Sequence, residues 1–549
     1  MTNSGSAREM KAEKTHDPQV AAAARAPSAP NLREAVSGHL GKALRTRSYR
    51  AVKAGEKLPK EEQLAWRIAE MAAGDWDADS AVDDMVGNRI IDNAGVAIAA
   101  LGRRAPKVAR AMALAHPALP GGPGAPLFGL PNDRLFDFTW AGYANAVAVR
   151  ELDFHDNIMA AETAHPGDAI PTLLAAAQHS GASGRDLIRA VATCYEAQLR
   201  LSERISLNKH RIDHTGHLGP AIASGLGALL RLDADTIYQA VQFAAHVSMF
   251  TRQGRKGQLS SWKAFAPGLV GKMAVEAIDR AMRGETSPSP VWEGDYGIFA
   301  ILLDGADARY EVRLPEGREP RRGILSTFTK EHSAGYHGNA LIDLAKKVRS
   351  RVPDLGQIEK VDIYSKEFTH IVMGSGSGDP EKYDPGTSRE TLDHSAMYIF
   401  AVALEDGDWH HERSYAEKRR QRPETIALWR KTETHEDPEW NRRYDDEPDP
   451  LKKAQGGRVE ITLKSGEVVV DELAVANAHP MGETPFRRPE YIRKADQLFE
   501  GVVSRREAAR FYDLVDRLAA LGPDEVRQVN AVSDLAPVEP SERDGRGIF

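Results

Sequence analysis

The chain has 549 residues, of which 42% are hydrophobic and 28% are charged, and its formal net charge is −7. This length predicts at least two domains. The acidic balance argues against nucleic acid as the main partner, because phosphate binding needs a basic surface. The single cysteine, Cys194, excludes an intrachain disulfide and a self-contained iron–sulfur cluster. We therefore expect a cytoplasmic protein.

No apolar run approaches the roughly 20 residues that a membrane-spanning helix needs, so no membrane insertion is expected. The first 30 residues are rich in Ala, Pro, Ser and charge. This composition predicts a flexible N-terminal tail over residues 1–30.

Residues 31–324 predict a large all-helical domain. Apolar residues recur at spacings of three and four in LAWRIAEMAAG, DDMVGNRIIDNAGVAIAAL and RDLIRAVATCYEAQLRLSERI. Glycines and prolines mark the expected helix ends, which are Gly102, Gly181, Gly219, Pro220 and Gly284. The pattern is not that of a parallel sheet.

Residues 325–484 predict a smaller α+β domain. Apolar and polar residues alternate in VDIYSKEF and in GRVEITLKSGEVVVDELAV, where Ser465-Gly466 indicates a hairpin turn. Helical patterns, GNALIDLAKKVRS and SAMYIFAVALEDG, lie between these strands. Residues 485–549 include EAARFYDLVDRLAAL and are expected to return to the helical domain. The predicted fold class is therefore mainly α with an added α+β domain.

A charged stretch covers residues 406–453. Such a run predicts a solvated surface insertion in the α+β domain. The alternative is a segment that binds a partner or forms a dimer arm.

The first candidate cluster lies in residues 145–178, where six candidate side chains fall within sixteen positions, and these are Asp153, His155, Asp156, Asn157, His165 and Asp168. The Pro166-Gly167-Asp168 step predicts a turn into a helix, whose free N–H groups could bind a carboxylate. A nearby histidine could move a proton near neutral pH. The structural alternative is that Asp168 caps the helix while Asp153 bonds to His155.

The second cluster contains three histidines at i, i+4 and i+7, which are His210, His214 and His217. On one helix they would share a face and could bind zinc. Gly216 and Pro220 favour a loop that enters a helix instead, which breaks this spacing. We expect no metal here and a single pocket histidine, His214.

The third cluster is basic and comprises Arg252, Arg255, Lys256, Lys263 and Lys272. Its first half predicts a loop, and a helix is expected from Pro267 onward. A basic loop before a helix could hold a polycarboxylate, because arginine offers bidentate pairing and lysine a point charge. Ordinary surface charge is the alternative.

The fourth cluster, STFTKEHSAGYHGNALIDLA, contains Lys330, His332, Tyr336 and His337. It lies where the helical region gives way to the mixed domain, and domain interfaces favour ligand sites. The sequence has no GxxxxGK[ST] motif and no convincing GxGxxG after a strand, so no nucleotide cofactor is indicated.

Four runs of the sequence occur in the order and spacing of the MmgE/PrpD family. They are NAVAVRELDFHDN…HPGDAIPTLLAA, RIDHTGHLGPAIASGLGALL, SSWKAFAPG…KMAVEAIDRAMRGE and KEHSAGYHGNALIDLA. The chain resembles that family over about residues 60–520. The resemblance implies a helical domain, an α+β lid, an active site between them and a homodimer. It also implies activity on small polycarboxylates.

Within the family the chain is most similar to iron–sulfur-independent 2-methylcitrate dehydratases. This similarity implies cofactor-free dehydration of 2-methylcitrate to 2-methyl-cis-aconitate in propionate catabolism, with citrate as an additional candidate. Other family members are cis-aconitate decarboxylase and an iminodisuccinate epimerase, and either reaction in the same pocket is an alternative. A helical scaffold that binds partners through residues 406–453, and a zinc hydrolase, are alternatives of other classes.

Matching positions from the decarboxylase branch fall on Asp153, His165, His214 and Lys263. A family threonine is replaced by Asn157, and a second lysine falls near Thr329 or Lys330. A later tyrosine falls near Thr369 and His370 and has no match. The Asn157 replacement and the unmatched tyrosine favour the dehydratase.

The resulting expectation is a proton transfer by His165 or Asp153 as base, with His214 as acid toward the leaving hydroxyl. The two histidines could exchange roles. The residues expected to hold the substrate are Lys263, Arg252, Arg255, Asn157, Lys330 and His332.

Overall fold

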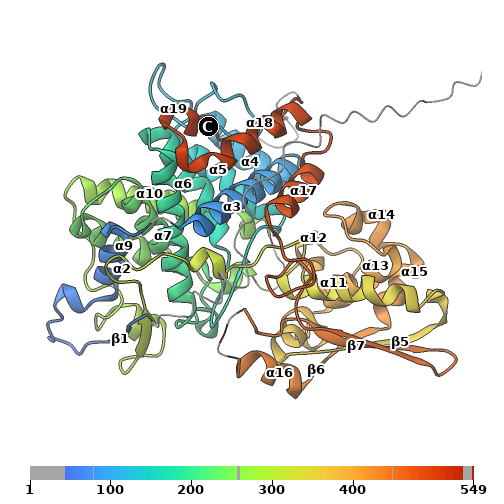
Figure 1. Ribbon diagram of the computed structural model, residues 1–549. Coiled ribbons are helices and arrows are strands. Elements are labelled where there is room, and N and C mark those ends of the chain that lie inside the picture. Colours follow the sequence, from blue (N-terminus) through green and yellow to red (C-terminus); the bar gives the residue numbers. More distant parts are fainter. Residues whose placement is uncertain are drawn as a thin grey trace, which may run out of the picture.

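The computed structural model describes residues 44–535, except 78, 256–259, 448 and 450, together with 547–548. The predicted tail, residues 1–30, and Lys256 lie outside the described residues. A large hydrophobic core is formed mostly by residues before Phe328 and after Phe486, and a second core extends from Ala334 to Val469. A helical body therefore lies beside a smaller α+β body (Figure 1), and the predicted fold class is confirmed.

Helices rich in alanine and glycine build the larger body. They are α2 (Leu64–Ala73), α3 (Ser80–Ala100), α4 (Arg104–Leu114), α5 (Phe138–Glu151), α6 (Ile170–Ser180), α7 (Gly184–Ser202), α8 (Thr215–Leu229), α9 (Ala234–Val247) and α10 (Trp262–Met282). Every residue of α8 is buried. Small side chains allow such close contact between helices, since backbones can approach one another where no bulky group intervenes.

Three predicted helix ends are confirmed, among them Gly102 directly after the C-cap of α3, and two are wrong. Gly181 and Gly284 follow α6 and α10 with φ of +68° and +86°, a left-handed conformation that favours glycine. Gly219 and Pro220 instead lie inside α8. The reason is packing, because a Cβ at Gly219 would come within 2.9 Å of the Ala244 carbonyl oxygen in α9.

The helical body also contains two small sheets, contrary to the all-helical prediction. Strand β1 (Thr46–Arg50) pairs antiparallel with β4 (Arg309–Arg313), and β2 (Ile158–Met159) pairs with β3 (Thr163–Ala164). The long-range pairing of β1 with β4 has no local sequence signature, and a two-residue strand is too short to show alternation.

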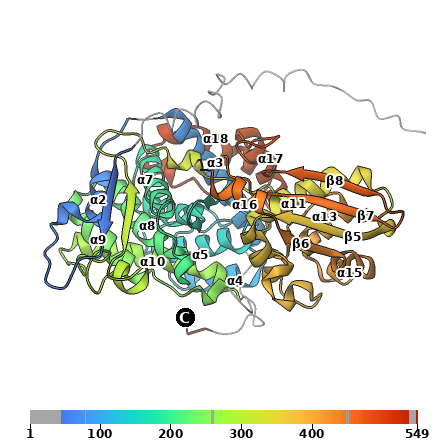
Figure 2. The same cartoon turned by 90° about the horizontal axis from the view of Figure 1, so that it is seen from below.

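The α+β domain is built on a four-stranded sheet in the order β6-β5-β7-β8. Its strands are β5 (Ile358–Ser365), β6 (Thr432–Glu436), β7 (Gly457–Leu463) and β8 (Val468–Leu473). The β7–β8 hairpin turns at Gly466, where φ is +87°, as predicted. Figure 2 shows the sheet with its helices. These are α11 (Tyr336–Val348), α12 (Arg389–Leu392), α13 (Ala396–Asp406), α14 (Glu417–Arg420), α15 (Pro423–Arg430) and α16 (Pro438–Asp445).

The prediction that residues 406–453 form a solvated insertion is wrong. This segment supplies β6, which pairs parallel with β5, and its Trp429 and Trp440 are 0% and 2% exposed. Charged residues surround these two buried tryptophans in the sequence, so the charge pattern alone gave no sign of their burial. The segment is therefore part of the core and the sheet of the α+β domain.

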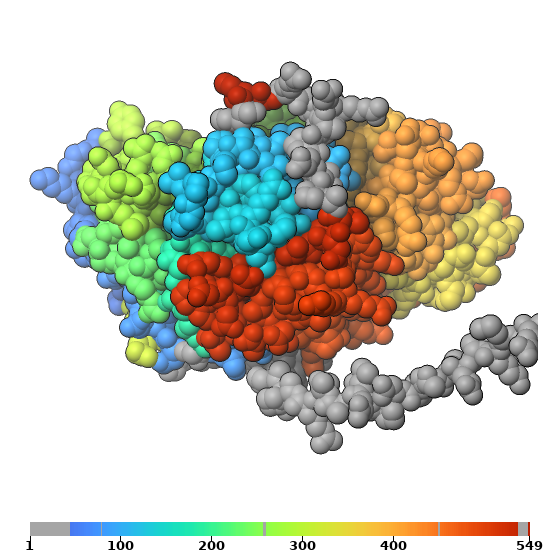
Figure 3. Space-filling model, turned by 90° about the horizontal axis from the view of Figure 1, so that it is seen from above, coloured from blue at the N-terminus to red at the C-terminus, as the bar shows by residue number. Residues whose placement is uncertain are grey.

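The chain then returns to the helical body. Helices α17 (Arg488–Phe499) and α18 (Arg505–Asp516) pack on α3, and α19 (Pro523–Val526) follows. Figure 3 shows these red residues against the blue N-terminal helices and beside the orange α+β domain. Among the helices of the described ranges, none combines the length and apolar character needed to cross a membrane.

Candidate active site

A cavity of about 390 Å³ lies between the two domains. One wall comes from the end of α5, the β2–β3 hairpin, the start of α8 and the start of α10. The other wall comes from α11, residues 368–373 and residues 377–394. This volume is in the range of small-molecule sites, and the cavity is the place where most of the predicted site residues meet.

Asp153 lies at the centre of the charged groups of this cavity. It follows the C-terminal end of α5 with φ +49°, a left-handed conformation in which a helix usually places glycine. One carboxylate oxygen accepts hydrogen bonds of 2.6 Å from both Arg150 and Lys330. The other lies 3.0 Å from the Lys263 ammonium. A carboxylate thus stands among three cationic side chains.

This arrangement fixes the charge of Asp153. Burial alone would raise the pKa of its carboxyl, but the three neighbouring cations outweigh burial and hold that pKa well below its usual range. Asp153 is a carboxylate at neutral pH, and both of its oxygens are occupied. A group so acidic is a weak base, so the arrangement favours a charge-balancing and positioning role.

His165 presents an unprotonated nitrogen to the cavity. Its Nδ1 lies 2.9 Å from the backbone carbonyl oxygen of Asp156, which assigns the proton to Nδ1. Its Nε2 lies 3.9 Å from Asp153. Burial, reinforced by the nearby Arg150, holds the His165 pKa well below its ordinary value. The imidazole is therefore neutral and its Nε2 can accept a proton.

His214 lies beside His165, with ring centroids 5.3 Å apart. Its Nδ1 is 3.3 Å from Asp213, and burial lowers its pKa to about 3 although Asp213 opposes this shift. Its Nε2 is buried and has no hydrogen-bond partner among the described residues. Because Nδ1 faces the Asp213 carboxylate, the single proton of this neutral imidazole is assigned to Nδ1, and Nε2 can only accept a hydrogen bond.

In the basic cluster, Arg255 supports neighbouring residues, whereas Arg252 and Lys263 line the cavity and are available to a ligand. Arg255 pairs with Asp213 at 2.8 Å and donates to the Lys263 carbonyl oxygen at 3.2 Å. Pro267, four residues after Lys263, has no N–H to donate to that oxygen. Arg255 satisfies that oxygen in its place, so the helix can include Pro267. The helix α10 accordingly begins at Trp262, earlier than the expected start at Pro267. Arg252 also lines the cavity, where burial lowers its pKa.

The fourth cluster is split by the structure. Lys330 lines the cavity, and burial lowers its pKa to about 8 although Asp153 opposes this shift. The His332 side chain instead pairs with Asp343 at 2.9 Å and is not part of the cavity lining. The expected substrate contact of His332 is therefore not supported, because a buried carboxylate outside the cavity orients its ring.

The three histidines of the zinc alternative do not converge. His210 lies 3.4 Å from Asp304, whereas the His217 Nε2 lies 2.8 Å from the Ile205 carbonyl oxygen. The predicted loop before a helix explains this, since α8 begins at Thr215, after His210 and His214.

Asp168 has a structural role that differs from the one expected. Its carboxylate lies 2.9 Å from His155 Nε2 and 3.8 Å from Arg150. No side-chain cap is found at the start of α6. His155 therefore pairs with Asp168 and not with Asp153. This pair does not line the cavity, and it supports Arg150, which does.

Five lining residues carry buried polar atoms that have no hydrogen-bond partner in the described chain. These atoms are Arg150 Nε, the Asn157 amide, His214 Nε2, the Tyr336 hydroxyl and His337 Nε2. Unpaired buried polar atoms are costly, so their gathering on one cavity indicates a polar ligand. Asn157 and His214 were expected from the sequence, whereas Tyr336 and His337 were only members of a cluster.

Sequence reasoning missed Arg150 and the Asp393–His394 pair. Arg150 lies three residues before Asp153, a helical spacing that could have been noticed. Asp393 is 3.3 Å from Lys263, and His394 also lines the cavity. This pair is 130 residues from Lys263 in sequence, so no local pattern announces the contact.

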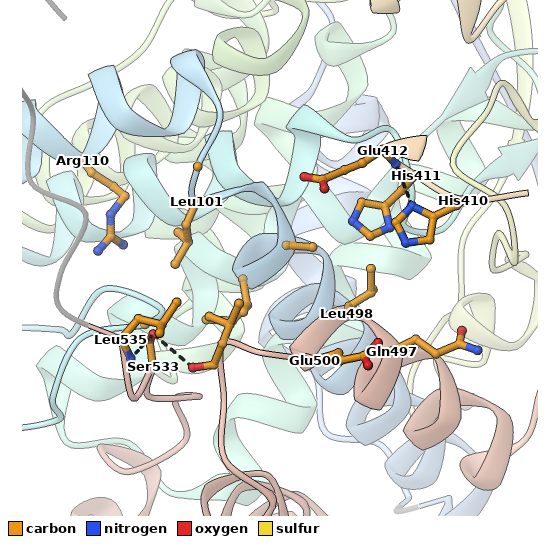
Figure 4. A pocket seen from close by; sticks show the side chains of 15 residues that line it. Leu101, Arg110, His410, His411, Glu412, Gln497, Leu498, Glu500, Ser533 and Leu535 are labelled. Carbon is orange, nitrogen blue, oxygen red and sulfur yellow. Dashed lines mark hydrogen bonds between the residues drawn. The ribbon is translucent and has the colours of Figure 1, made fainter. Parts of the chain in front are cut away.

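A cavity of about 420 Å³ on another part of the domain boundary lacks this chemistry (Figure 4). There His410 and His411 stack at 4.4 Å, and Arg110 donates to the Phe128 carbonyl oxygen at 2.7 Å. None of the residues around Asp153 lines it. The charged groups and imidazoles around Asp153 thus belong to the 390 Å³ cavity.

Together, a buried carboxylate, several cations and two neutral imidazoles between two domains define an acid–base site suited to a small anion. Family models agree with this class. The MmgE/PrpD N-terminal domain matches residues 62–311, and the MmgE/PrpD C-terminal domain matches residues 332–520. The chain belongs to the MmgE/PrpD family.

Several relatives carry the name 2-methylcitrate dehydratase. The mitochondrial protein of Yarrowia lipolytica is 27% identical over 396 residues, covering 67% of this chain and 72% of that protein. The Cupriavidus necator protein is 26% identical, covering 67% and 75%, respectively. The Escherichia coli K12 protein is 25% identical, covering 67% and 76%.

Proposed function

We propose that the protein is a hydro-lyase that removes water from 2-methylcitrate to give 2-methyl-cis-aconitate. The observation that carries this proposal is the meeting of unpaired polar atoms, cations and neutral imidazoles on one interdomain cavity. The names of the relatives, at about 25% identity, support the choice of substrate.

The base in this proposal is His165. Dehydration removes a proton from the carbon that bears the methyl group. His165 has its tautomer fixed by the Asp156 carbonyl oxygen, so Nε2 is the accepting nitrogen. Asp153, 3.9 Å away, would stabilise the imidazolium that forms.

Cations must stabilise the negative charge that develops on the carboxylate beside that carbon. Lys263 and Arg252 line the cavity and are suited to this role, and the Asn157 amide can donate a further hydrogen bond. Arg255 acts indirectly, because its guanidinium is already paired with Asp213.

The acid role that the sequence suggested for His214 moves to Lys330. With a pKa of about 3, the His214 imidazole is neutral at neutral pH, and its one proton lies on Nδ1, which faces the Asp213 carboxylate, so Nε2 has none to donate. Lys330, with a pKa of about 8, is protonated there. Two of its three N–H groups go to Asp153, which leaves one for the leaving hydroxyl. His214 would orient the hydroxyl by accepting its hydrogen bond.

This chemistry uses side chains alone, so the proposal includes no metal or other cofactor. Its test is turnover of 2-methylcitrate by chelator-treated protein, followed by ultraviolet absorbance of the conjugated alkene. We expect a signal that survives chelation. Loss of cis-aconitate with carbon dioxide release, and no reaction of 2-methylcitrate, would contradict the proposal and indicate a decarboxylase.

A further inference from the structure

A second cavity, of about 410 Å³, adjoins the candidate active site. The two cavities share five lining residues, which are Met159, Thr163, Asn208, His337 and Phe368. The outer part of the second cavity includes the exposed residues Ala161, Lys209, Glu367 and Asp445. The space therefore extends from the protein surface to a wall that it has in common with the active site.

Lys366 is the unusual residue of this second cavity. It follows the end of β5 and is only 5% exposed. Its ammonium lies 2.8 Å from the centroid of the Tyr444 ring and 5.3 Å from that of Phe368. In the part of the chain that the structure describes, its ammonium has no hydrogen bond or ion pair, and Asp445 is the carboxylate that influences it most.

A buried ammonium without an anion is costly, and aromatic faces offset only part of that cost. Burial accordingly holds the Lys366 pKa well below its ordinary value. A carboxylate entering the cavity would supply the missing partner. The rim carboxylates Glu367 and Asp445 would oppose tight retention of such an anion. Attraction by Lys366 and repulsion by these two carboxylates together favour brief binding of an anion that then moves on, over tight binding.

We propose that this second cavity is a docking site for small carboxylate anions, held by Lys366, from which substrate enters the active site past His337 and Phe368. The proposal rests on the proposed function for the identity of the anion. The docking itself depends only on the cavity and its lysine.

The first test compares Lys366→Met, which keeps the length and removes the charge, with Lys366→Arg. We expect Lys366→Met to lower kcat/KM for 2-methylcitrate about tenfold, by loss of local attraction, and to leave kcat within about twofold. Lys366→Arg should restore most of kcat/KM. Added salt should lower kcat/KM less in Lys366→Met than in the unchanged protein.

The second test does not need turnover. Tricarballylate, a tricarboxylate without a hydroxyl to eliminate, is mixed with each protein, and its association rate is measured by stopped-flow tryptophan fluorescence. Lys366→Met should slow association about tenfold, the size expected for loss of electrostatic attraction. If no tricarboxylate is turned over but association still depends on Lys366, the proposed function fails and the docking site stands.

A third variant blocks the passage without changing charge. Ala161→Trp would fill the outer part of the second cavity, whereas the matched control Ala99→Trp would fill the separate cavity of Figure 4. We expect slower tricarballylate association and lower kcat/KM for Ala161→Trp only. Unchanged association and kcat/KM in both Lys366→Met and Ala161→Trp, with folding verified by circular dichroism, would overturn the proposal.

Discussion

At the scale of single residues, the cavity is organised by charge compensation around Asp153. Its left-handed backbone at the end of α5 directs the carboxylate toward Arg150, Lys263 and Lys330. Removing one member of such a buried group leaves the others unpaired, which costs more than the pair contributes. The two imidazoles beside this group are neutral because burial disfavours their charged forms.

His165→Gln should lower kcat by at least ~100-fold, the usual contribution of a general base. His214→Gln should cause a smaller loss, because the amide can still contact the substrate hydroxyl. Steady-state kinetics with 2-methylcitrate measure both effects. His179→Gln, which changes a histidine outside the cavity lining, serves as the control. A larger loss in His214→Gln would reverse the two assignments.

The pH dependence of kcat/KM should show a decline centred at a pH of about 8. Lys330 loses its proton as pH rises through its pKa of about 8, and the acid for the leaving hydroxyl disappears. The acidic limb should lie well below 6.5, because His165 becomes protonated only there. The pH profile of kcat/KM, followed from about pH 10 down to the acid limit of the protein's stability, measures both limbs. A flat profile up to pH 10 would contradict the assignment to Lys330.

At the scale of elements, close helix contact decides where helices begin and end. Gly219 remains inside α8 because α9 approaches it, and α10 begins at Trp262 because Arg255 occupies the carbonyl oxygen that Pro267 leaves free. These contacts position His214 just before α8 and Lys263 in the first turn of α10. The local rules for glycine and proline fail where a neighbouring element satisfies the backbone.

Gly219→Ala should therefore destabilise the protein by about 1–3 kcal/mol, the usual cost of overpacking. The added Cβ would lie 2.9 Å from the Ala244 carbonyl oxygen, a backbone atom that cannot move aside easily. Gly102→Ala is the matched control, since nothing lies within 4 Å of its Cβ position. Thermal denaturation of both variants measures the difference. Equal melting temperatures would show that α8 and α9 can separate without cost.

At the scale of the whole molecule, the site exists because two domains meet. Lys263 from the helical domain reaches Asp393 of the α+β domain, and Lys330 reaches back to Asp153. The α17 helix strengthens the same boundary, where Lys494 donates to the carbonyl oxygens of Phe154 and Lys330. The candidate catalytic groups are thus coupled to the relative position of the domains.

Trp429→Ala should cost about 3–5 kcal/mol, because a large side chain would leave a cavity in the α+β core. Arg442→Ala, on an exposed face of the same 406–453 segment, should cost little. Chemical denaturation monitored by circular dichroism distinguishes the two. Similar stability of both variants would support the solvated insertion that the charge pattern suggested.

The sequence by itself determined the amphipathic helices, the β7–β8 hairpin and the two-part organisation, because these follow from local periodicity and turn chemistry. It also provided Asp153, His165, His214 and Lys263 as candidates. Only the tertiary structure decided that the His332 side chain lies outside the cavity, that His394 and Tyr336 line it, and that residues 406–453 contribute to the core and the sheet of the α+β domain. Contacts between distant segments and the charge state of buried groups depend on packing, which no local pattern records.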